Sequence, residues 1–359
     1  MASMNADGKI AKGRGTSSKV DARFLQHERT GFDDGWDLED DEKTVPTEIF
    51  RETPRTVISR NQSPDIPFET SVNPYRGCEH GCVYCYARPS HAYVDLSPGI
   101  DFETKIFAKS NAAQVLSKEL AKPRYVCKPI AMGTNTDPYQ PAERQLRITR
   151  DLIEVLHDCR HPLSIVTKSW LVERDLDLLQ PMAADGLVKV FVSITSLKHD
   201  LARRLEPRAT APARRLKTVQ TLNDAGVPTG VMFAPVIPFI NDAEMEQVLE
   251  QAAAAGAKTT GYIMLRLPNE VKQLFREWLE THEPGKTEHV FSIIRDLRAG
   301  RENDPDYFTR MRGQGVYADL IRSRFNKACK KFGLNRHNWA LNTGLFAPPI
   351  PASPQQTLF

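Results

Sequence analysis

The sequence lacks any long hydrophobic run. Its longest apolar stretch, residues 188–194, is interrupted by two polar residues, and a membrane span needs 18 or more consecutive apolar residues. The first fourteen residues contain three basic residues with no apolar segment behind them, so a secretory signal is not predicted. We therefore expect a cytoplasmic protein with no membrane partner.

Neither sign of charge is in large excess, because 48 Lys and Arg face 45 Asp and Glu for a net charge of +3. This balance alone predicts neither a nucleic-acid nor a membrane partner. Hydrophobic residues make up 40% and charged residues 26% of the chain, which is ordinary globular usage and excludes a wholly disordered protein. The length of 359 residues allows one large α/β barrel with extensions.

The two ends of the chain differ from its middle. Residues 1–60 have few periodic apolar positions, and seven of the ten residues in 33–42 are Asp or Glu; we expect a flexible acidic extension. The core barrel should cover 61–268. Residues 269–345 are helical in pattern and form either a cap on the barrel or a small second domain. A disordered tail is expected over 346–359.

In the middle of the chain, short β-branched runs alternate with amphipathic stretches. We predict strands at residues 129–133, 163–167, 188–194, 229–233 and 262–265, with a first strand just before Cys78. Gly226 and Gly256 follow the predicted ends of two helices, and Asn241 stands three residues before Glu244 at a helix start. Repeated βα units predict a parallel sheet with right-handed crossovers. Six units favour an α/β fold with a partial (β/α)6 TIM-like barrel.

Cysteine is scarce but locally concentrated. Three of the six cysteines follow the spacing Cys78-x3-Cys82-x2-Cys85 in the segment NPYRGCEHGCVYCYARPSHAY. Three soft thiolates on one loop suit an iron–sulfur cluster or zinc. A four-iron cluster would keep one iron free to bind a small molecule, whereas His80 or His91 could complete a structural zinc site. The other three cysteines have no partner in the sequence and are expected to be small buried thiols.

The cysteine spacing followed by Tyr86 resembles the signature of the radical S-adenosylmethionine superfamily. Four later segments resemble more narrowly the group related to spore photoproduct lyase: GTNTDPYQPAE (133–143), IVTKS (165–169), VSIT (192–195) and LEPRA (205–209). The resemblance covers about residues 70–270. It implies that Cys78, Cys82 and Cys85 hold a [4Fe–4S] cluster whose fourth iron binds the amino and carboxylate groups of S-adenosylmethionine. It also implies an enzyme that cleaves this molecule and starts hydrogen abstraction from an unknown substrate, with an electron donor such as flavodoxin or ferredoxin.

Polar residues stand at the carboxyl ends of the predicted strands, where the active sites of βα barrels are built. Thr136 and Asp137 follow the second strand, and we expect them to accept hydrogen bonds from the methionine ammonium. Lys168 follows the third strand and Ser193 lies near the end of the fourth. A cation and a hydroxyl at these places suit the methionine carboxylate.

Two tyrosines flank the third cysteine. The resemblance implies that Tyr84 is a catalytic residue that relays a radical and that Tyr86 packs on the nucleoside. The lyase carries a hydrogen-donor cysteine near the end of its second strand, but residues 133–137 contain no thiol. Cys127 stands about six residues earlier, roughly 20 Å away in an extended chain. We therefore expect that this protein does not efficiently repair the spore photoproduct.

Two basic stretches bear on the substrate. Residues 198–217 contain seven Lys or Arg against two acids, and residues 310–336 contain eight against one. On one face with the barrel mouth they would bind a phosphate backbone; the alternative is that they are solvated helix faces. Nucleic-acid repair or modification is therefore kept as an alternative function. The rival of another class is a zinc-stapled binding protein without catalysis.

Overall fold

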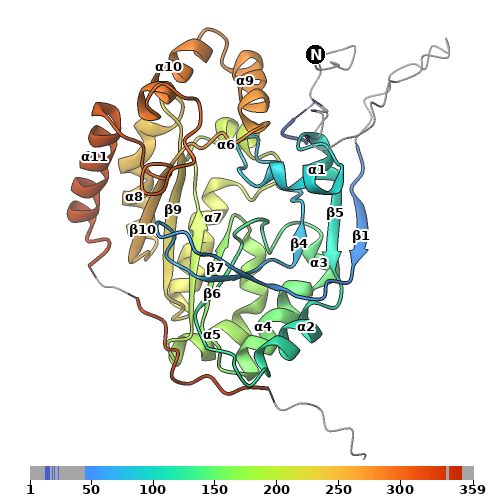
Figure 1. Cartoon of the computed structure of the whole chain (residues 1–359). Helices are drawn as coiled ribbons and strands as arrows, with labels where there is room; N and C mark the ends of the chain where they lie inside the picture. Colours follow the sequence, from blue (N-terminus) through green and yellow to red (C-terminus); the bar gives the residue numbers. More distant parts are fainter. Residues whose placement is uncertain are drawn as a thin grey trace, which may run out of the picture.

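The computed structural model describes residues 13–16, 18, 20, 23, 45–336 and 339–349. Its central sheet has the order β10-β9-β8-β7-β6-β3-β2. These strands are β2 (Ile58–Arg60), β3 (Thr70–Val72), β6 (Ile130–Met132), β7 (Leu163–Thr167), β8 (Val188–Ser193), β9 (Thr229–Val236) and β10 (Thr259–Met264). All neighbours from β3 to β10 pair in parallel, whereas β2 is antiparallel to β3 at the edge. The predicted partial barrel is confirmed (Figure 1).

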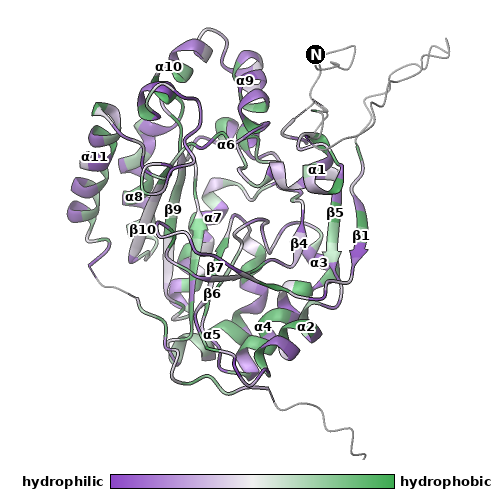
Figure 2. Cartoon of the chain, in the orientation of Figure 1, coloured by the Kyte–Doolittle hydropathy of each residue, from purple (hydrophilic) through white to green (hydrophobic). Residues whose placement is uncertain are grey.

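Burial explains the register of the barrel strands. Val72, Met132, Ile165 and Val190 lie side by side across four strands, and all four are fully buried in the main core. Figure 2 shows hydrophobic colour along the central strands and hydrophilic colour on outer surfaces such as that of α11 (Val316–Phe332). Removing these β-branched and aliphatic side chains from water stabilises the sheet by about 25 cal/mol per Å².

Helices connect the strands and cover the sheet. They are η1 (Arg88–Val94), α1 (Ile100–Thr104), α2 (Ala112–Leu120), α3 (Glu143–Leu146), α4 (Ile148–Asp158), η2 (Trp170–Asp175), α5 (Leu176–Ala184), α6 (His199–Leu205), α7 (Pro212–Asp224), η3 (Asp242–Glu244) and α8 (Met245–Ala254). Gly226 and Gly256 adopt left-handed backbone angles after α7 and α8, with φ of 77° and 98°, which confirms both predicted helix ends. The predicted helix start is confirmed, because Asn241 directly precedes η3, but its side chain does not cap the helix and instead bonds the Ile237 amide and the carbonyls of Thr195 and Pro235.

A second sheet with the order β1-β5-β4 was not predicted from the sequence. It joins β1 (Glu48–Glu52), β5 (Lys105–Lys109) and β4 (Tyr75–Arg76). Since β1 and β2 belong to sheets, the expected flexible extension does not reach residues 48–52 and 58–60. The acidic run at 33–42 lies outside the described residues. Four of the five β1 side chains are exposed, so this strand has no apolar alternation for sequence analysis to detect.

The helical C-terminal region forms a cap on the barrel, and its apolar side chains belong to two apolar clusters that also contain barrel residues. It consists of α9 (Val271–His282), α10 (Thr287–Leu297) and α11, with α11 beside α8 and with α9 and α10 near α6 (Figure 1). Phe325 packs on Tyr262 with ring centroids 4.7 Å apart, while Trp278 and Phe291 share an apolar cluster with Cys82. No described helix is long and apolar enough to cross a bilayer. Residues 350–359 of the predicted tail are outside the described residues.

Candidate functional site

The three clustered cysteines occupy the loop between β4 and η1. Cys78 and Cys82 are buried, and Cys85 is partly exposed. Cys85 packs against both the apolar group that contains Cys78 and the group that contains Cys82, so it lies near each of the other two cysteines. Gly81 permits this path, because it has a φ of 66° and an added Cβ would stand 2.7 Å from a Glu103 carboxylate oxygen.

Burial favours the protonated form of two of these thiols, Cys78 and Cys82. It raises the pKa of Cys78, and it raises the pKa of Cys82 to about 12 although the nearby Lys168 ammonium lowers it. A metal ligand must be a thiolate, so cluster binding releases these protons. Three soft donors on one loop, two of them buried, fit a cluster that takes three protein ligands.

A buried ion pair holds the cysteine loop in place. Arg88 and Glu103 are both fully buried, and their charged groups lie 2.6 Å apart. The same guanidinium donates to the Cys82 carbonyl at 2.9 Å and to the carbonyls of Pro98 and Gly99 at 3.2 and 2.9 Å. The peptide that follows a cluster cysteine is therefore held by a residue outside the motif.

The two histidines considered for zinc are engaged elsewhere. His80 Nδ1 lies 3.3 Å from an Asp137 oxygen. His91 Nε2 lies 3.0 Å from the Lys105 carbonyl, and burial lowers the pKa of His91 to about 4. Within the part of the chain that the structure describes, no three His, Cys, Asp or Glu side chains converge as ligands of a single metal ion.

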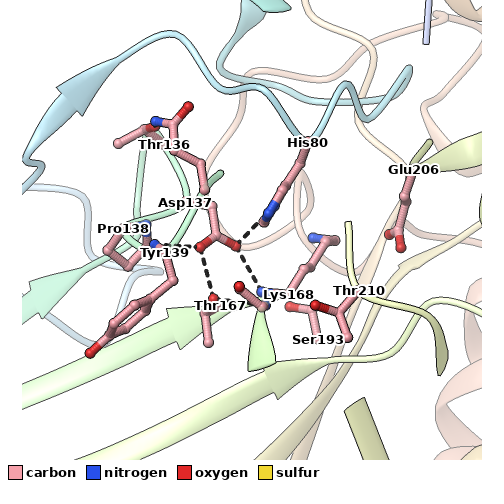
Figure 3. Close-up of polar contacts among 12 residues, drawn as sticks. His80, Thr136, Asp137, Pro138, Tyr139, Thr167, Lys168, Ser193, Glu206 and Thr210 are labelled. Carbon is pink, nitrogen blue, oxygen red and sulfur yellow. Dashed lines mark hydrogen bonds and ion pairs between the residues drawn. The ribbon is translucent and has the colours of Figure 1, made fainter. Parts of the chain in front are cut away.

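Asp137 is a hub between three segments (Figure 3). Its carboxylate accepts from Tyr139 N at 2.9 Å, Thr167 Oγ1 at 2.7 Å and Lys168 N at 2.7 Å, and it pairs with His80. Burial raises its pKa, but the His80 charge and these hydrogen bonds outweigh burial and lower the pKa to about 2. Three hydrogen bonds and one ion pair thus fix the position of this carboxylate.

Thr136, the other predicted acceptor for the methionine ammonium, also has partners within the chain. Its hydroxyl donates to the Gly77 carbonyl at 2.6 Å and accepts from Gln140 Nε2 at 3.0 Å. Thr136 thus ties the turn after β6 to the start of the cysteine loop. A direct contact of Thr136 or Asp137 with an ammonium stays a prediction.

Lys168 directly follows β7, and Ser193 is the last residue of the neighbouring strand β8. Their side chains lie in the same region of the site (Figure 3). The Lys168 ammonium lies 5.9 Å from the centre of the Tyr84 ring. Among the described residues, no carboxylate lies within 4 Å of it. Burial lowers its pKa, but the nearby Cys82 and Glu206 outweigh burial and raise the pKa. This cation can therefore accept an anionic ligand at contact distance.

Glu206 is a site residue to which sequence reasoning assigned no role. It is 2% exposed and accepts hydrogen bonds from the Tyr84 hydroxyl, Thr195 Oγ1 at 2.6 Å and Arg215 at 2.5 Å. Burial raises its pKa, but Arg215 and Lys168 with these hydrogen bonds lower it to about 2. A single glutamate within the basic stretch 198–217 is the signal that could have found it.

Tyr86 lies at the mouth of the barrel. Its side chain is 48% exposed, and its hydroxyl donates to the Thr134 carbonyl. The Thr134 hydroxyl in turn accepts from Asn73 Nδ2 at 3.0 Å. Arg266 stands 5.5 Å from the centre of the Tyr86 ring. Tyr86 and Arg266 thus lie together, although 180 residues separate them in the sequence.

Most cations of the basic stretch 198–217 form ion pairs within the protein. Four of its seven cations bind carboxylates at 2.5 to 3.1 Å, namely Arg204, Arg208, Arg214 and Arg215. Two of them, Arg208 and Arg214, line a hollow of about 320 Å³ beside His80, but Glu79 and Glu173 already neutralise them. In the second stretch, Arg310 pairs with Asp65 at 2.6 Å. These ion pairs join separate helices and loops of the chain to one another.

Comparison with known proteins agrees with this architecture. The solved structure of spore photoproduct lyase complexed with dinucleoside spore photoproduct matches with a TM-score of 0.57 and 16% identity, covering 80% of each chain. A mutant of that lyase with bound AdoMet and dinucleoside spore photoproduct matches with a TM-score of 0.56 and 16% identity, over 81% of this chain and 86% of that one. At this identity the likeness shows the fold.

Relatives in sequence extend the comparison. An uncharacterised protein of Mycobacterium tuberculosis is 39% identical over 250 residues, which are 69% of this chain and 72% of the relative. An uncharacterised protein of Methanocaldococcus jannaschii is 29% identical over 173 residues, 48% of this chain and 62% of that protein. Residues 72–252, half of the chain, match the model of the radical SAM superfamily. That family uses a [4Fe–4S] cluster and S-adenosylmethionine. An iron–sulfur cluster therefore takes the place of the structural zinc that the sequence left as an alternative. The chain therefore belongs to the radical SAM superfamily and is a radical SAM enzyme.

Proposed function

We propose that Cys78, Cys82 and Cys85 hold the [4Fe–4S] cluster and that Lys168 and Ser193 bind the carboxylate of S-adenosylmethionine beside it. The observation that carries this proposal is the Lys168 ammonium, which lies next to Cys82 with no carboxylate of the described residues within 4 Å. A desolvated cation favours an anion supplied by a ligand. When bound, the cluster supplies the electron that cleaves S-adenosylmethionine and so starts hydrogen abstraction from the substrate.

The surrounding residues set the geometry of this site. Asp137 holds the backbone amide of Lys168 at 2.7 Å and Thr136 holds the Gly77 carbonyl, so both keep the cysteine loop and the end of β7 in place. Both also remain the predicted acceptors of the methionine ammonium. We place the half-exposed ring of Tyr86 against the nucleoside. Tyr84, with its hydroxyl bound to Glu206, is the proposed relay residue.

The decisive experiment is reductive cleavage of S-adenosylmethionine by the anaerobically reconstituted protein. With dithionite, or with flavodoxin or ferredoxin as the proposed electron donor, the wild type should form 5′-deoxyadenosine, measured by mass spectrometry. Lys168→Met should weaken binding of S-adenosylmethionine by about 10- to 100-fold, because a hydrogen bond to a charged group contributes roughly 1.5–3 kcal/mol. Lys217→Met is the matched control, since Lys217 is exposed and bonds Gln220 at 3.1 Å. A wild type with full iron and no deoxyadenosine would contradict the proposal.

Nucleic-acid modification is the second candidate function. It is supported by the basic side chains that follow the last barrel strand. There Arg310 lies close enough to Arg266 for its charge to lower the pKa of Arg266. Basic groups beside a barrel mouth suit a phosphate backbone. Single- and double-stranded oligonucleotides should then raise the rate of deoxyadenosine formation in low salt. A rate that no DNA or RNA changes would remove this candidate and leave a small molecule as the substrate.

A further inference from the structure

The segment Leu265–Arg266–Leu267 directly follows β10, the last strand of the barrel. Leu265 and Leu267 are 3% and 0% exposed and belong to the apolar cluster around α9 and α10. Side chains of an extended segment alternate between its two sides, so the buried leucines direct Arg266 the other way. Its guanidinium carbon lies 5.5 Å from the centre of the Tyr86 ring, at the end of the barrel where active sites are built.

Arg266 has no counter-charge at contact distance. Among the described residues, no carboxylate lies within 4 Å of its guanidinium. Its single polar contact there is with the Met311 sulfur at 3.7 Å, and its Nε is buried with no hydrogen-bond partner. The Arg266 side chain is half-buried, and a charge that is partly removed from water without a counter-charge is unfavourable. Such a group is explained most simply if a ligand supplies the missing anion.

The neighbouring arginines all make hydrogen bonds to oxygen atoms of the protein, although Arg310 alone of the three compared pairs with a carboxylate. Arg310 makes two hydrogen bonds to the Asp65 carboxylate, at 2.6 and 2.8 Å. Arg312 donates to the Tyr262 carbonyl at 3.1 Å, and Arg298 donates to the Leu265 carbonyl at 2.8 Å. Burial lowers the pKa of Arg266, and the charge of Arg310 lowers it further. Of these four arginines, Arg266 is the one without a hydrogen bond to an oxygen atom of the described residues.

We propose that Arg266 binds an oxyanion of the substrate, a carboxylate or a phosphate, and holds it beside Tyr86. The inference rests on the proposed function, in which Tyr86 lies against the nucleoside. The forked donors of a guanidinium match both kinds of oxyanion in a bidentate manner. Because the Tyr86 side chain is 48% exposed, this corner is open to a ligand. The substrate is thus anionic, and its charged group is fixed at a set distance from the bond that reacts.

Calorimetric titration of the reconstituted protein tests this site directly. The probes are inorganic phosphate and acetate, added at constant ionic strength in chloride. The wild type should bind at least one of them saturably, and Arg266→Gln should bind it at least tenfold more weakly. Arg322→Gln is the matched control, because Arg322 is an exposed arginine on α11 that pairs with Asp319. Preference for phosphate or acetate separates a phosphate-bearing from a carboxylate-bearing substrate.

Thermal melting separates ligand binding from a structural role. If Arg266 is a ligand-binding residue, Arg266→Met should melt at or above the temperature of the wild type without anions, because the change removes an unpaired buried charge. The preferred anion should raise the Tm of the wild type and not that of the variant. A lower Tm in Arg266→Met, or equal anion affinity in wild type and Arg266→Gln, would overturn the proposal. So would a loss of S-adenosylmethionine affinity with unchanged anion affinity.

The two proposals fail in different measurements. If the wild type forms no 5′-deoxyadenosine while anion binding depends on Arg266, the proposed function fails and the oxyanion site stands. If the wild type cleaves S-adenosylmethionine and its anion affinity does not depend on Arg266, the oxyanion site fails and the proposed function stands.

Discussion

Replacing Arg88 by alanine should both destabilise the protein and impair retention of the cluster. The change leaves the Glu103 carboxylate fully buried without its partner at 2.6 Å. It also removes the donor to the Cys82 carbonyl, so the peptide after a cluster cysteine is no longer fixed. Stability and iron binding should therefore fall together, although Arg88 lies outside the cysteine motif.

The size of the effect follows from the burial of the pair. Removing one partner of a buried ion pair costs about 3–5 kcal/mol. The Pro98 and Gly99 carbonyls also lose a donor, but such losses within one network do not add fully. With an unfolding entropy of about 2.1 cal/mol/K per residue over 359 residues, this range lowers the Tm by about 4 to 7 °C.

The assay combines thermal melting of the reconstituted protein with iron counted per chain. Arg88→Lys keeps the charge but loses the fork, so it should fall between wild type and Arg88→Ala. Arg322→Ala is the control; it breaks an exposed pair with Asp319 and should change stability by about 0–1 kcal/mol. An Arg88→Ala protein with full iron and a Tm within about 1 °C of the wild type would refute the reasoning.

Three further outcomes are expected. Iron binding should be lost when any cysteine of the loop is replaced by alanine and kept when a scattered one is replaced, which iron analysis of all six variants checks: Cys78, Cys82 and Cys85 against Cys127, Cys159 and Cys329. Lys168→Ala should weaken S-adenosylmethionine binding by roughly 1.5–3 kcal/mol in calorimetry, and unchanged affinity would remove Lys168 from the site. Glu206 has a pKa of about 2 in the fold against 4.5 normally, so its stabilisation of about 3 kcal/mol is present above pH 4.5 and lost as pH falls toward 2. Glu206→Gln should therefore flatten the acid limb of stability against pH, and an identical limb would contradict this.

The barrel was predictable because its strands are short runs in which at least every second side chain is buried. The segment 188–194 is rich in valine, and the observed β8 ends one residue earlier. Gly226 and Gly256 end helices because only a residue without a Cβ adopts their backbone angles easily. β1 escaped prediction for the opposite reason, because it exposes most of its side chains and so produces no apolar pattern. A strand was expected just before Cys78, where β3 and the two-residue β4 lie, but not the division of these two strands between two sheets.

The site divides in the same way between local and distant information. The cysteines lie within eight residues, so their spacing alone indicates a common ligand. Glu206 reaches Tyr84 across 122 residues, and no periodicity in a sequence reports such a contact. Asn241 shows the limit of local rules: its spacing to Glu244 suits a cap, but its amide bonds two backbone carbonyls elsewhere. Pairings of polar groups depend on the assembled fold.

The position of Thr134 predicts how far the chemistry departs from that of spore photoproduct lyase. Its carbonyl accepts a hydrogen bond from the Tyr86 hydroxyl, and its own hydroxyl bonds Asn73. Residues 133–137, which follow β6, contain no thiol. Cys159 and Cys329 belong to the main apolar core, and Cys127 precedes β6. A hydroxyl donates a hydrogen atom far less readily than a thiol. The wild type should therefore turn dinucleoside spore photoproduct over slowly or to abnormal products, and Thr134→Cys should increase clean conversion to the thymine dinucleoside. Liquid chromatography distinguishes these products, and many clean turnovers by the wild type would prove the argument wrong.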